Sequence, residues 1–127
     1  MLRQSGFNFD KHKTDGIPHN LFAEYLITNG LVLNPLNTWI TFHGGMDFAY
    51  VLKQLIGESL PTKEDDFLDK LDRYFVNYFD CKELKRDLDI SGGLGRVAME
   101  LCVDWVGKMH QAGSDAIVTG GVYFKLR

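Results

Sequence analysis

Apolar residues recur at helical spacing along most of this 127-residue chain, and this periodicity is the strongest constraint on its fold. Positions i, i+3, i+4, i+7 and i+8 are apolar between residues 48 and 56 and again between 94 and 102, as in helices that bury one face. Only Thr38–Phe42 and Tyr78–Phe79 have the β-branched and aromatic character of strands. Two short strands cannot form a stable sheet alone. Either the helices make the core themselves, or a larger sheet lies outside this sequence.

Four further helices are predicted from the same signals, and the first has Leu21, Phe22, Tyr25 and Leu26 at helical spacing and ends at Asn29–Gly30. One begins at Pro61–Thr62 and turns inward an apolar stripe of Phe67, Leu68, Leu71 and Phe75. Asp80 is placed to cap a helix over Cys81–Leu88, because a carboxylate accepts hydrogen bonds from the unpaired N–H groups of a first helical turn. The last helix runs from Asp115 to about Leu126, with its inward side formed by Ile117, Val118, Val122 and Phe124.

Composition narrows the class of protein without choosing a function. A chain of this length with 45% hydrophobic residues is enough for one globular domain. The net charge of -3 gives no basic surface for nucleic acid, so a phosphate partner would have to be held locally, for instance through a divalent metal. Cys81 and Cys102 are expected to be reduced core residues of an intracellular protein. The polar N-terminus and the lack of a long apolar stretch predict no membrane role.

Two carboxylates follow glycine-bearing turns and lie where helices begin. Asp47 comes after Gly44–Gly45, and Asp115 comes after Gly113. Each can be an ordinary carboxylate of a helix N-terminus, stabilised by free N–H groups and the helix dipole. Alternatively, the two can hold Mg²⁺ or Mn²⁺ as hard oxygen ligands and so activate water against a phosphodiester. Such a site normally needs more than two carboxylates.

His110 precedes Asp115 by five positions and has two interpretations as well. It can be a solvated loop residue, or it can be the general base that takes a proton from an attacking water. His43 is a weaker candidate. It could complete a zinc site with His110, Asp47 and Asp115, but the spacing of these four residues matches no established zinc motif. Gly92–Gly95 resembles part of a phosphate loop, but the Lys that such a loop requires is missing, which favours a plain turn.

Together these segments resemble one enzyme family. The segments that carry the likeness are His43–Tyr50, Leu60–Pro61, Tyr78–Lys82, Gly92–Leu94 with Val97–Ala98, and His110–Asp115 with Thr119–Gly120. They are similar to the Caf/Pop-type deadenylase, the nuclease subunit of the Ccr-Not complex. The likeness covers nearly the whole chain but only the C-terminal half of the family's catalytic domain.

The resemblance implies a ribonuclease-H-like α/β fold, of which residues 1–127 would be a mostly helical C-terminal part with one or two strands. It implies 3′-to-5′ removal of poly(A) from mRNA with two divalent metals, Mg²⁺ or Mn²⁺. Asp47 would be the third metal-binding acid, Asp115 the fourth, and His110 the base. Poly(A) RNA, the Ccr-Not scaffold and a partner nuclease would be its partners, in the cytoplasm and the nucleus.

The sequence departs from the family pattern in two respects. The first two acids of such enzymes form an Asp-x-Glu pair on an early strand, and no Asp-x-Glu occurs in this chain. Gly44 and Met46 also replace the commoner residues of the His-Ser-Gly-Tyr-Asp segment. Two hypotheses therefore stand side by side: part of a metal-dependent poly(A) exoribonuclease, or a catalytically incomplete module that binds the scaffold of the complex.

Overall fold

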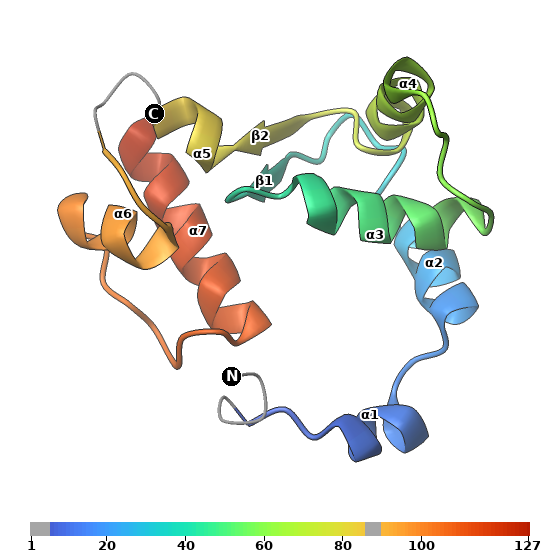
Figure 1. Cartoon of the computed structure of the whole chain (residues 1–127), viewed down its shortest axis with the longest axis horizontal. Helices are drawn as coiled ribbons and strands as arrows, with labels where there is room; N and C mark the ends of the chain where they lie inside the picture. Colours follow the sequence, from blue (N-terminus) through green and yellow to red (C-terminus); the bar gives the residue numbers. More distant parts are fainter. Residues whose placement is uncertain (1–5, 86–89) are drawn as a thin grey trace. The chain divides into compact units, whose positions relative to one another are not determined.

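Helices make up most of the secondary structure, as the apolar periodicity predicts. The computed structural model describes residues 6–85 and 90–127. Within these ranges the elements follow the order α1, α2, β1, α3, α4, β2, α5, α6, α7 (Figure 1). Strands β1 (Trp39–Thr41) and β2 (Tyr78–Asp80) are hydrogen-bonded neighbours in a parallel pair. Both predicted strands are thus confirmed.

The chain folds as two compact units that alternate along the sequence. The central unit consists of residues 16–39 and 44–78, and the terminal unit consists of residues 1–15, 40–43 and 79–127. Each unit has a hydrophobic core of its own. That residues 1–127 form part of one exonuclease domain stays a prediction.

In the central unit, α2 (His19–Thr28) and α4 (Glu64–Tyr74) pack against α3 (Gly45–Ile56) (Figure 1). Phe75 is only 1% exposed, and its ring centroid lies 4.8 Å from that of Phe48 and 5.1 Å from that of Trp39. The helix predicted over residues 48–56 is confirmed, because α3 ends before Gly57, which has the left-handed conformation at φ 65°. The buried core consists of Ala23, Leu26, Val32, Phe48, Leu52, Leu55, Leu71 and Phe75.

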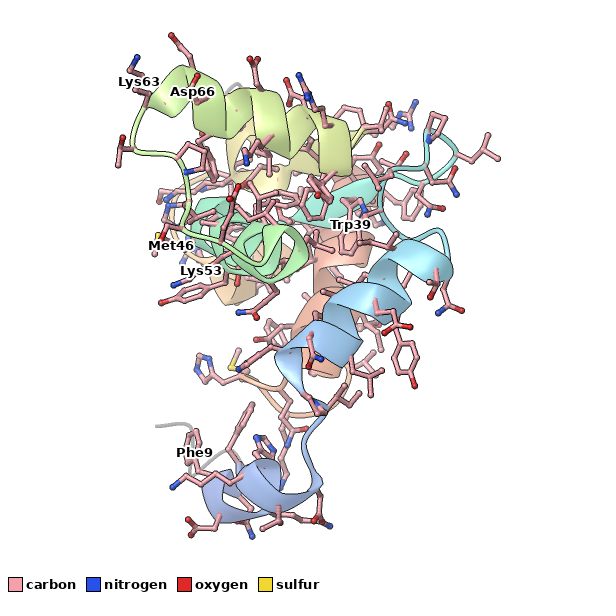
Figure 2. The ribbon with its side chains drawn as sticks, turned by 90° about the vertical axis from the view of Figure 1, so that its right-hand side faces the viewer. Phe9, Trp39, Met46, Lys53, Lys63 and Asp66 are labelled. Atoms are coloured by element: carbon pink, nitrogen blue, oxygen red, sulfur yellow. The ribbon has the colours of Figure 1, made fainter. Side chains whose placement is uncertain are left out.

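The start and the buried stripe of α4 differ from the prediction. The helix begins at Glu64 rather than at Pro61–Thr62, since Lys63 still has an extended backbone at ψ 136°. Leu71 and Phe75 are buried, but Leu68 is 41% exposed because α4 buries only the narrow stripe that contacts α3. Asp66 lies on the exposed side of the first turn, near Lys63 (Figure 2).

In the terminal unit, α5 (Cys81–Leu84) and α6 (Leu94–Glu100) pack against α7 (Ala112–Leu126). Val118 and Val122 are fully buried, as predicted, whereas Ile117 and Phe124 are 59% and 75% exposed. The prediction for these last two is wrong because α7 is apolar on several sides and buries only the side that α5 and α6 cover. The buried core consists of Cys81, Val97, Ala98, Val118, Val122 and Tyr123.

The two cysteines have different environments. Cys81 is fully buried, and burial, together with the charge of Asp80, raises the pKa of its thiol to about 11. Cys102 is exposed, contrary to the prediction of a core residue. The helix that was expected to include it ends at Glu100, and Cys102 has a left-handed backbone at φ 52° while the Val103 N–H donates to the Ala98 carbonyl at 2.8 Å.

Two short helices, α1 and α5, differ from the prediction. A short helix that was not predicted, α1 (Phe9–Asp15), has no buried residue and so gave no apolar periodicity. The helix predicted over Cys81–Leu88 ends at Leu84, and its remaining residues after Lys85 lie outside the described residues. Among the described residues, no helix has both the length and the apolar character needed to span a bilayer.

Candidate active site

The segment that leads into α7 holds His110 and Asp115 together. His110 has a left-handed backbone at φ 63°, and its N–H donates to Oδ1 of Asp115 at 3.1 Å. Asp115 is the fourth residue of α7 and is half-buried, whereas the His110 side chain is exposed. A carboxylate acceptor strengthens such a hydrogen bond. Asp115 therefore fixes the backbone that presents the imidazole, so two of the three predicted site residues are structurally coupled.

The buried Ser114 connects this segment to the preceding loop through two hydrogen bonds. Ser114 accepts a hydrogen bond from the indole Nε1–H of Trp105 at 3.1 Å and donates its own hydrogen to the Val106 carbonyl. These bonds tie the loop before His110 to the first turn of α7. Sequence reasoning did not single out Ser114, although it lies inside the His110–Asp115 segment, because its two partners are eight and nine residues away.

The second predicted turn repeats the arrangement. His43 also has φ 63°, and its N–H donates to Oδ1 of Asp80 at 2.7 Å. The same oxygen accepts the Lys82 N–H at 2.8 Å, which confirms Asp80 as the N-cap of α5. Both left-handed histidines thus donate their backbone N–H to a carboxylate.

Asp47 is the third residue of α3 and is exposed. The residue before it, Met46, is exposed as well and is labelled in Figure 2. Its position at the start of a helix after the Gly44–Gly45 turn is as predicted. It belongs to the central unit, whereas His110 and Asp115 belong to the terminal unit. Within the terminal unit, the structure pairs His110 with Asp115.

The carboxylates match the chemistry of Mg²⁺ or Mn²⁺, which prefer oxygen ligands, but they are too few for a complete site. Across residues 6–85 and 90–127, no three His, Cys, Asp or Glu side chains are grouped so that they could hold a metal ion. One oxygen of Asp115 is already engaged by His110.

Comparison with known proteins defines the class of the fold. No protein-family model matches the chain. The structure of Pop2p from S. pombe in its Mg²⁺- and Mn²⁺-bound form superposes with a TM-score of 0.94 at 43% identity, over 99% of this chain and 50% of that one. CAF1 in the structure of the yeast NOT1 MIF4G domain co-crystallised with CAF1 gives 0.84 at 25% identity, over 95% and 49%. The fold is therefore that of the ribonuclease-H-like nucleases, as predicted.

Sequence relatives point to the same group of proteins. The chain is 41% identical to the probable CCR4-associated factor 1 homolog 7 of Arabidopsis thaliana, over 100% of this chain and 46% of that protein. It is 43% identical to the poly(A) ribonuclease pop2 of Schizosaccharomyces pombe, over 100% of this chain and 38% of that protein. The chain spans less than half the length of these relatives. Along its whole length it is homologous to the C-terminal half of the Caf/Pop-type deadenylases, and the predicted resemblance is confirmed.

Proposed function

We propose that this chain carries part of the active site of a metal-dependent 3′-to-5′ exoribonuclease that removes poly(A) from mRNA. The observation that carries the proposal is the His110–Asp115 segment, in which the carboxylate holds the backbone of the histidine at 3.1 Å. Its support comes from relatives that include a protein named poly(A) ribonuclease and a structure described as bound to Mg²⁺ and Mn²⁺.

The residues divide the work of hydrolysis between them. Asp47 and Asp115 would hold the divalent cations, which supply water activation and charge stabilisation when bound. His110 is exposed and held at its backbone, so its imidazole would take the proton of the attacking water. Asp115 would then have two tasks, since one of its oxygens accepts the His110 N–H and its carboxylate would also bind a cation. The first two acids of the family are not among these 127 residues, so activity requires a chain that supplies them.

A chimera tests this proposal with the missing acids restored. The segment of S. pombe Pop2 that matches this chain is replaced by it, and shortening of an oligo(A) RNA is measured with Mg²⁺ and with Mn²⁺. Asp47→Ala and Asp115→Ala should abolish shortening, and His110→Ala should slow it by about 10²- to 10⁴-fold, the usual contribution of a general base. Asp66→Ala is the matched control, because Asp66 is an exposed carboxylate in the first turn of a helix.

Asp115→Asn separates the two tasks of Asp115. Asparagine keeps an oxygen that can accept the His110 N–H but loses the negative charge. We expect the turn to persist while shortening is lost. Undiminished shortening in the Asp47 and Asp115 variants would contradict the assignment of both acids.

The scaffold of the Ccr-Not complex is the partner we propose for the protein, with a partner nuclease in the same assembly. Its support is that a yeast relative was co-crystallised with a NOT1 MIF4G domain. Retention of the 127-residue chain on an immobilised MIF4G domain tests this directly. Retention together with an inactive chimera would favour the alternative, a catalytically incomplete module that binds the scaffold. Action in the cytoplasm and nucleus belongs to the same proposal, and imaging of a tagged protein checks it.

A further inference from the structure

The His43 backbone has a conformation that needs support from its surroundings. At φ 63° it lies in the left-handed region, which side chains other than glycine seldom adopt. A strained residue of this kind persists only where neighbouring groups determine it. The chain runs from His43 directly into Gly44, the N-cap of α3, and Gly45, its first residue, and Asp47 follows two positions later. His43 is thus the residue that directly precedes the glycine turn before Asp47.

The group that fixes His43 is the carboxylate of Asp80. The His43 N–H donates to Oδ1 of Asp80 at 2.7 Å, a length typical of hydrogen bonds to a charged acceptor. Asp80 is the last residue of β2, and the strand pairing brings the end of β2 beside the end of β1, where Thr41 Oγ1 donates to the Phe79 carbonyl at 3.4 Å. The N–H of Lys82 anchors the same oxygen at 2.8 Å. One oxygen of the Asp80 carboxylate thus accepts hydrogen bonds both from the first turn of α5 and from His43.

We propose that Asp80 is a positioning residue: it locks the backbone of His43 and thereby the glycine turn that carries Asp47. The relation parallels the one between Asp115 and His110, where the histidine has the same φ and donates to a carboxylate in the same way. The significance for catalysis rests on the proposed function. The effect of Asp80 on the backbone of His43, called the lock below, can be measured without any enzymatic activity.

The experiment uses the 127-residue chain and follows backbone amides by ¹H-¹⁵N correlation spectra and hydrogen exchange. Asp80→Asn keeps the acceptor oxygen, so the His43 amide should stay protected. Asp80→Ser can still cap α5 with its hydroxyl but is too short to reach His43 as well, so the Lys82 amide should stay protected and the His43 amide should not. Asp80→Ala should speed exchange of the His43 amide by about 10- to 100-fold, as expected for loss of a hydrogen bond to a charged acceptor.

Rescue by glycine separates positioning from helix capping. Because glycine adopts φ near 60° without support, His43→Gly in the Asp80→Ala or the Asp80→Ser chain should return the Gly44, Gly45 and Asp47 resonances to their parental positions. The Lys82 resonance should not return in the Asp80→Ala pair. The proposal is overturned if Asp80→Ser leaves the Gly44, Gly45 and Asp47 resonances in place, or if His43→Gly fails to restore these three. Should Asp80→Ala not fold, the Asp80→Ser pair decides the matter.

The chimera adds a readout that depends on the proposed function. There, Asp80→Ser should lower kcat with little change in KM, and His43→Gly should restore it. An inactive parental chimera would refute the proposed function and leave the resonance experiment to decide the lock. An active chimera whose kcat is unchanged by Asp80→Ser would refute the positioning role alone.

Discussion

Two adjacent glycines of α7 allow a sharp test of how the terminal unit packs. A Cβ atom on Gly121 would lie 2.7 Å from Cγ1 of Val103, whereas a Cβ atom on Gly120 would meet no tertiary neighbour within 4 Å. Both positions lie inside the same helix, so alanine changes their helix propensity equally. We expect Gly120→Ala to stabilise the protein and Gly121→Ala to be destabilising relative to it.

The magnitude follows from two opposing effects. Alanine in place of glycine inside a helix stabilises by about 0.8–1.0 kcal/mol. At Gly121 the new methyl group also overpacks the core, which costs about 1–3 kcal/mol. Val103 cannot easily turn away, because a β-branched side chain is restricted at χ1. The propensity gain cancels between the variants, so their free energies of unfolding should differ by about 1–3 kcal/mol.

Urea unfolding followed by circular dichroism measures this difference. Val103→Ala removes the obstructing methyl groups, so in the Gly121→Ala background it should recover most of the loss. Val103→Ala alone should destabilise, since it only removes packing, and the resulting double-mutant cycle isolates the contact. Equal stability of the two glycine variants, or a cycle without coupling, would refute the packing of α7 against Val103.

Four further predictions concern buried groups. Folding raises the pKa of the Cys81 thiol from 9.0 to about 11, so the unfolded chain loses this proton first. The free energy of unfolding should therefore fall as pH rises from about 9 to about 11. Cys81→Ala should weaken this pH dependence in unfolding experiments. In the native protein a thiol reagent should label the exposed Cys102 and spare Cys81 until urea is added. Lys85 is buried and donates to two carbonyls at 2.7 and 3.3 Å, so Lys85→Met should cost about 1–3 kcal/mol in urea unfolding. Phe75→Ala should cost about 3–5 kcal/mol, whereas the exposed Tyr50→Ala should change stability by less than about 0.5 kcal/mol in the same assay.

Those parts of the fold that depend on neighbours in sequence were predicted well. The apolar stripe of α3, its end at Gly57 and the capping role of Asp80 each depend on residues within a few positions. The exposed sides of α7 were not predicted, because Ile117 and Phe124 are as apolar as the residues of this helix that are buried. Only the helices packed on α7 decide which side is covered, and periodicity cannot show them.

The candidate site divides in the same way. His110 and Asp115 are five residues apart, and their spacing alone placed them at one turn. The bond between His43 and Asp80 joins residues 37 positions apart, so no local pattern indicates it. Left-handed histidines are equally hidden, since glycine is the residue that signals this conformation. The sequence indicated the chemistry of the site but not the hydrogen bond between His43 and Asp80.

The alternation of the two units has a consequence for how such a protein can change during evolution. The chain passes from one unit to the other after residues 15, 39, 43 and 78. No single crossover between genes can therefore exchange one unit and leave the other intact, and a deletion that removes one must interrupt the other. A single crossover that separates the residues around Asp47 from those around His110 and Asp115 therefore divides at least one unit, although each unit has a hydrophobic core of its own.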